Sequence, residues 1–211
     1  MRNHTLFGAQ GSGSAAVEAA LAAAGLPYDW VEAASWLPPG PGLEALTRVN
    51  PLQQIPTLVL DDGTVLTESA AILIELGLRH PDSGLLPAHP TARARAIRGL
   101  VFVAANCYAA ISIIDYPQRW CAGADEDDIE RIRAGSRERL HKHWSIFAEQ
   151  FGTGFMAGGR PGALELLATV VSKWSGSRPH LAQARPEFHA LLLTVEQHPA
   201  VAAVFARHWP N

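Results

Sequence analysis

A carboxylate and a hydroxyl stand side by side at Glu68–Ser69, where a strand-like run passes into a helical one. The first N–H groups of a helix carry partial positive charge and bind anions. A carboxylate accepts hydrogen bonds and a hydroxyl can donate them, so the pair suits a zwitterionic amino acid. The alternative is structural: Thr67 or Ser69 caps the helix, and Glu68 favours its first turn.

The cysteines and histidines do not form a recognisable reactive centre. Cys107 and Cys121 are 14 residues apart without a CxxC pattern, which disfavours a disulfide scaffold and a zinc site. Cys107 has no basic neighbour in the sequence, which is typical of an inert buried thiol. His141 and His143 are two residues apart and so face different sides of a helix, whereas a metal site needs a spacing of three or four. We therefore expect no metal site.

The first 80 residues change periodicity repeatedly, which is typical of a small mixed sheet with helices on its faces. An alanine-rich run favours a helix, and Gly25-Leu26-Pro27 ends it. Asp61-Asp62-Gly63 has the composition of a hairpin turn. The expected elements are strands at 5–7 and 28–33, helices at 15–24 and 68–80, a loop at 36–42 and a hairpin at 57–66.

The residues after Pro81 contain helical patterns and no convincing strand. A proline-punctuated linker at 81–90 separates the two textures. Helices are expected at 91–116, 125–151, 162–174, 185–198 and 200–208. The pattern predicts an α/β domain over 1–82 followed by an all-α domain over 90–211.

Composition excludes several classes of protein. The 211 residues are 48% apolar and 18% charged, so the chain can bury a substantial core. A net charge of −3 without long charged blocks argues against nucleic acid or an anionic membrane as the main partner. The longest apolar stretches carry polar residues, and the N-terminus lacks a secretory pattern. We expect a cytoplasmic protein that does not span a membrane.

Residues 50–72 read NPLQQIPTLVLDDGTVLTESAAI. This segment closely resembles the glutathione-binding half of cytosolic glutathione transferases. The resemblance implies a thioredoxin-like N-terminal domain followed by a helical domain, which matches the two textures. It also implies a homodimer, with glutathione as cosubstrate and no tightly bound cofactor.

The resemblance assigns glutathione contacts within this segment. It implies a cis peptide bond before Pro56, which would turn the backbone of Ile55 toward the cysteinyl residue of glutathione. Glu68 would accept from the γ-glutamyl amino group, and Ser69 would bind its carboxylate. Gln53 and Gln54 could bond the peptide. An ordinary trans proline at a strand edge is the alternative for Pro56.

The family activates the glutathione sulfur with Tyr, Ser or Cys near the end of the first strand. Here that loop contains no tyrosine or cysteine, and the candidates are Ser12, Ser14 and the backbone N–H groups, with Gln10 as a possible amide donor. A donor to the thiolate lowers the thiol pKa. Alignment places the cysteine position of other members at Gly13, and Ser14 alternatively fits as the helix N-cap.

The second substrate of this family lies between the two domains. Trp36, Phe102, Tyr108 and Trp120 could line an apolar pocket there, although aromatic residues at helical spacing are also typical of a core. Gly162 and Glu165 resemble the family's capping box, with glycine in place of Ser or Thr. The expected activity is thiolate attack on an electrophile. The alternatives are disulfide or peroxide reduction with two glutathiones, and a non-catalytic binding protein.

Overall fold

The N-terminal part of the chain forms a four-stranded mixed sheet. The computed structural model describes residues 3–36 and 38–210. The strands are β1 (His4–Gly8), β2 (Tyr28–Glu32), β3 (Thr57–Val59) and β4 (Val65–Leu66), in the order β2-β1-β3-β4. β1 is parallel to β2 and antiparallel to β3, and β3 is antiparallel to β4. The expected sheet and hairpin are confirmed.

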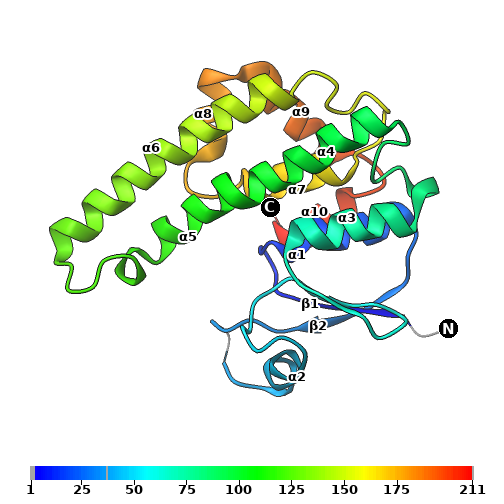
Figure 1. The fold of residues 1–211 in the computed structure, drawn as a ribbon, viewed down its shortest axis with the longest axis horizontal. Helices are drawn as coiled ribbons and strands as arrows, with labels where there is room; N and C mark the ends of the chain where they lie inside the picture. Colours follow the sequence, from blue (N-terminus) through cyan, green and yellow to red (C-terminus); the bar gives the residue numbers. More distant parts are fainter. Residues whose placement is uncertain (1–2, 37, 211) are drawn as a thin grey trace.

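Helices cover both faces of this sheet. Successive side chains of β1 point to opposite faces, so each face carries apolar side chains that a helix can bury. Leu6 belongs to the main core on the side of α1 (Ser14–Ala24) and α3 (Ser69–Arg79). Phe7 belongs to a smaller cluster with Leu46 of α2 (Pro41–Val49). Figure 1 shows α2 on the opposite side of the sheet from α1 and α3.

The sequence reading missed α2. It took the prolines and glycines of 36–42 as a loop, and Leu37 of that range lies outside the described residues. Pro41, however, occupies the start of α2, where its missing N–H costs nothing. The apolar face of α2 is short, and only Leu46 is fully buried.

The rest of the chain is helical, as expected. The elements are η1 (Pro81–Ser83), α4 (Pro90–Phe102), η2 (Val103–Tyr108), α5 (Ala109–Asp115), η3 (Pro117–Arg119), α6 (Glu126–Phe151), α7 (Ala163–Val171), α8 (Ser177–Ala184), α9 (Pro186–Gln197) and α10 (Ala202–His208). Helix α8 was not predicted, because Gly176 and Pro179 interrupt its pattern. Segment η2 is a π-helix within the continuous helical run from Pro90 to Asp115. The division at 82–90 into two domains stays a prediction.

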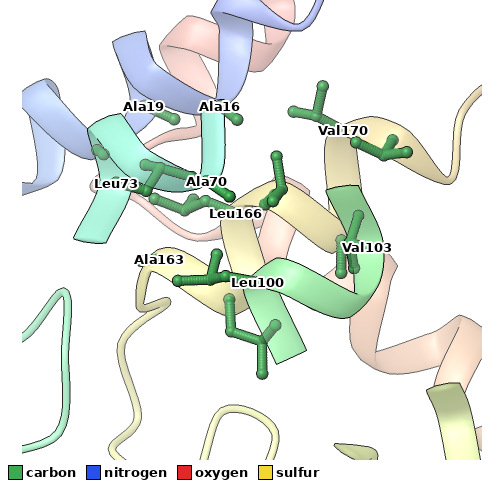
Figure 2. Packing of buried hydrophobic residues seen from close by; sticks show 14 of the residues in the cluster. Ala16, Ala19, Ala70, Leu73, Leu100, Val103, Ala163, Leu166 and Val170 are labelled. Atoms are coloured by element: carbon green, nitrogen blue, oxygen red, sulfur yellow. The ribbon is translucent and has the colours of Figure 1, made fainter. Parts of the chain in front are cut away.

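The two parts share one hydrophobic core. Small residues let α1 and α3 approach α7, and Figure 2 shows Ala16, Ala70 and Leu166 at this meeting point. Leu100 and Val103 pack from the other side of α7. The Glu165 half of the expected capping box is confirmed, since the Gly162 N–H donates to Glu165 Oε2 at 3.1 Å.

The run Pro90–Asp115 is apolar and long enough to cross a membrane by length and composition alone. The sequence reading expected no such stretch. In this structure the run packs against α6 and α7, with 39% of its apolar window buried.

Candidate functional site

The backbone of Ile55 is open at one end of the sheet. The Ile55–Pro56 peptide bond is cis, as the resemblance implies. Within residues 3–36 and 38–210, no group bonds the N–H or the C=O of Ile55. Thr57 pairs with Phe7, so Ile55 lies level with the residues that follow Gly8. An extended peptide could therefore pair with Ile55 as an added strand.

Asn50 holds the loop that presents Ile55. Its Nδ2 donates to the Gln54 carbonyl at 3.1 Å and to Thr57 Oγ1 at 2.9 Å, and its Oδ1 accepts from the Leu52 N–H at 3.1 Å. The side chain is only 4% exposed. Sequence reasoning did not assign this role, although an asparagine before a proline is a common turn signal.

The side chains of the two glutamines in this loop differ in their contacts with the rest of the protein. Gln53 has a backbone φ of 54°, and its Nε2 donates to Thr47 Oγ1 of α2 at 3.1 Å. Its amide is therefore engaged with the protein. The Gln54 side chain is exposed and remains a candidate for contact with a peptide.

Glu68 and Ser69 lie at the start of α3, as predicted. Glu68 is the N-cap residue, and its φ of 64° and ψ of 110° are rare for a residue with a side chain. The helix has no side-chain cap, so neither Thr67 nor Ser69 plays the capping role considered above. The first N–H groups of α3 remain open to an anion.

The Ser12 and Ser14 hydroxyls both point into the loop between β1 and α1. Ser12 Oγ lies 2.7 Å from the Ala9 carbonyl and 2.7 Å from Ser14 Oγ, which is itself 3.2 Å from the same carbonyl. The exposed fractions are 8% for Ser12 and 0% for Ser14. The N-cap of α1 is Gly13, so Ser14 is not the cap. Both hydroxyl protons are occupied within the loop.

The C-terminal helix α10 holds the same loop from outside. Gln10 Nε2 donates to the Arg207 carbonyl at 2.9 Å, and the Gly11 N–H donates to His208 Nδ1 at 3.1 Å. His208 Nε2 lies 2.6 Å from Glu18 Oε2, and Glu18 also accepts from Tyr28 and Arg207. Burial raises the pKa of Glu18, but these hydrogen bonds outweigh it and hold the pKa below its usual range. No local signal in the sequence identifies this contact.

The proposed pocket aromatics occupy different environments. Trp36 and Trp120 are 59% and 60% exposed. The Phe102 ring packs against Phe147 and Phe151 in the helical core, which separates it from the other candidates. Tyr108 reaches the loop: a Cβ added to Gly13 would lie 2.3 Å from its hydroxyl oxygen.

The two cysteines lie outside this loop. Cys107 is fully buried, and burial raises the pKa of its thiol far above neutrality, which agrees with an inert thiol. Cys121 is exposed. In the part of the chain that the structure describes, no three His, Cys, Asp or Glu side chains are arranged to hold a metal.

Comparisons with known proteins point to one family. Residues 14–78 match the model described as "Glutathione S-transferase, N-terminal domain". The chain is 38% identical over 124 residues to the "Uncharacterized GST-like protein YncG" of Escherichia coli K12, covering 57% of this chain and 58% of that one. It is 39% identical over 100 residues to glutathione S-transferase GstA of E. coli O157:H7, covering 46% and 50%. The alignments thus span only half to three-fifths of these relatives.

The similarity of fold extends further than the similarity of sequence. The crystal structure of a glutathione transferase homologue from Sulfitobacter with bound glutathione has a TM-score of 0.78 and 24% identity. The superposition covers 97% of each chain, so both halves of the fold are shared.

Proposed function

Because the chain belongs to the glutathione S-transferase family, we propose that it binds glutathione and activates the thiol for attack on an electrophilic small molecule. The observation that carries this proposal is the strand register. Thr57 pairs with Phe7, and Leu58 pairs with Leu66. The loop after Gly8, the open Ile55 backbone and the Glu68–Ser69 pair therefore share one end of three neighbouring strands.

The size of this edge suits an extended tripeptide. Three neighbouring strands span about 10 Å, since adjacent strands lie ~4.8 Å apart. Three extended residues span about 10 Å as well. With the cysteinyl backbone on Ile55, the γ-glutamyl group reaches Glu68 and Ser69 on one side. The sulfur then faces the loop between β1 and α1 on the other side.

The chemistry follows from this placement. The thiol loses its proton to solvent, and hydrogen-bond donors near the N-terminus of α1 stabilise the thiolate. The sulfur donates an electron pair to the electrophilic carbon and forms the S–C bond. The bond between that carbon and the leaving group breaks, and the leaving group departs with its electron pair. No protein nucleophile is needed, because neither cysteine lies in the loop.

Binding and turnover are tested separately. Calorimetry with glutathione tests binding, and glutathione sulfonate tests whether the site accepts an anion at the sulfur position. A chlorinated aromatic, an organic hydroperoxide and hydroxyethyl disulfide then test conjugation and the two reductions. Turnover of the hydroperoxide or disulfide alone would identify a reductase. Binding without any turnover would identify a non-catalytic member of the family.

We also propose a homodimer, formed through the exposed side of the Pro90–Asp115 run. Val101 is 51% exposed, and Ala105 and Ala109 are exposed on the same side. A groove of about 490 Å³ lies beside them, lined also by Ile132 and Arg139 of α6. An apolar face of this kind is normally covered in the working protein. We place the reaction in the cytoplasm, where reduced thiols persist.

A further inference from the structure

We infer that Tyr108, which belongs to the helical part of the chain, donates the hydrogen bond that stabilises the glutathione thiolate beside Gly13. This inference rests on the proposed function and names the donor within the proposed site. The Tyr108 hydroxyl lies so close to Gly13 that a Cβ there would be 2.3 Å from the oxygen. Such a contact is impossible for any other residue at position 13 unless Tyr108 moves.

The backbone does not explain the glycine at this position. Gly13 has a φ of −62° and a ψ of −16°, which every L-residue adopts readily. A glycine also weakens the start of a helix relative to Ser, Thr or Asp as N-cap. The close approach of Tyr108 is therefore the physical reason for glycine here.

The hydroxyl of Tyr108 is available as a donor. Across residues 3–36 and 38–210, no hydrogen bond involves this hydroxyl. Burial, with the negative charges of Asp115 and Glu68, raises the pKa of Tyr108 to about 12. The group thus keeps its proton at neutral pH.

The fold aims Tyr108 at the loop. Tyr108 is the last residue of the π-helical segment η2, which interrupts the run between α4 and α5. A π-turn rotates the following side chains relative to a regular helix, and such turns occur often at functional sites. The ring packs against Trp174, with the centroids 5.8 Å apart, which restricts the ring further.

The loop itself offers few other side-chain donors. Ser12 and Ser14 direct their hydroxyls to the Ala9 carbonyl and to each other. We assign these serines to holding the loop in shape. The N–H groups of Ser14, Ala15 and Ala16 are likewise bonded within the loop and the first turn. The Tyr108 hydroxyl is therefore the side-chain donor that remains at the position where the sulfur arrives. Activation of the thiol accordingly needs both parts of the chain.

Tyr108→Phe tests this directly, because it keeps the ring and removes only the hydroxyl. The thiolate absorbance of glutathione bound to the full chain is titrated against pH. In the variant, the pKa of the bound thiol should rise by about one to two units, the scale of losing a hydrogen bond to a charged group. Glutathione affinity at acidic pH, where the thiol is protonated, should not change. The pH profile of kcat/KM for conjugation should move with the titration.

Two further variants make the result specific. Cys107→Ala perturbs the packing of the same π-helical segment without removing a donor to the sulfur, so the titration should stay in place. Gly13→Ala forces the Tyr108 hydroxyl away and should raise the thiol pKa as Tyr108→Phe does.

An unchanged titration in Tyr108→Phe, with the thiol pKa still lowered, overturns the inference and leaves the proposed function intact. A shift in Ser12→Ala but not in Tyr108→Phe would assign the role to Ser12 instead. If the native chain binds no glutathione, the proposed function fails and the inference fails with it.

Discussion

His208, three residues from the last residue of the chain, accepts a hydrogen bond from the backbone N–H of Gly11 at 3.1 Å. Because Nδ1 is the acceptor, the ring proton is on Nε2, which donates to Glu18 at 2.6 Å. Gly11 has a φ of 68°, a conformation that glycine adopts easily. The end of α10 thus sets the shape of the loop that would receive the sulfur.

Replacing His208 should loosen this loop. His208→Ala removes the acceptor of Gly11 and one donor to a buried carboxylate, so the free energy of unfolding should fall by about 2–3 kcal/mol. Glutathione affinity should fall several-fold as well, because the loop must be ordered again on binding. Urea unfolding and calorimetry measure the two effects. His89→Ala, at an exposed residue without a side-chain cap bond, is the matched control. An unchanged affinity in His208→Ala would show that the loop keeps its shape without α10.

Stability should decrease in acid because of Glu18. Its pKa in the folded protein lies below the usual value of 4.5, so the unfolded chain binds the proton more readily. The stability that ionised Glu18 contributes is therefore fully present above pH 4.5. It is lost as the pH falls through the lower pKa that Glu18 has in the folded protein. Unfolding by urea between pH 7 and pH 3 measures this decline. Glu18→Gln should be less stable at pH 7 and should flatten the decline; an equally steep decline in the variant would assign the effect to other carboxylates.

Ser69 should contribute to binding through the open start of α3. Ser69→Ala removes one donor to the γ-glutamyl carboxylate, and glutathione binding should weaken by ~1–3 kcal/mol. Stability should change little, because Ser69 makes no side-chain cap bond in the free protein. Calorimetry measures the affinity and thermal unfolding checks the fold. Equal affinities for the two proteins would remove Ser69 from the site.

The assembly state should depend on the exposed face of the Pro90–Asp115 run. Light scattering should give about twice the chain mass of 22.7 kDa. Ala105→Glu places a charge on this face and should shift the mass toward that of one chain. Leu193→Glu, at a residue of α9 that is 40% exposed, should leave the mass unchanged. A single-chain mass for the native protein at all concentrations would contradict the proposed dimer.

Local sequence was sufficient for much of the fold. The alanine-rich run of α1, the turn at Asp61-Asp62-Gly63 and the acidic start of α6 each carry their own signal, since propensity, turn chemistry and capping act within a few residues. The strand-to-helix pattern of segment 50–72 also predicted the position of Glu68–Ser69 at a helix start, and its resemblance to the family implied the cis bond before Pro56. Helix α2 escaped this reading, because prolines and glycines around its start are typical of loops as well.

Contacts between distant residues were decided only by the tertiary structure. Gly13 and Tyr108 are far apart in the sequence, as are Gly11 and His208, and no periodicity relates the members of either pair. The Ser12 and Ser14 hydroxyls looked available in the sequence, but a turn brings the Ala9 carbonyl within reach of both. A hydroxyl's partner depends on which groups the fold brings within about 3 Å, and packing across the whole chain sets that distance. Local motifs therefore pointed to the edge that we propose to bind glutathione. Tyr108, the donor that we propose for the sulfur, could be identified only from the packing of two distant parts of the chain.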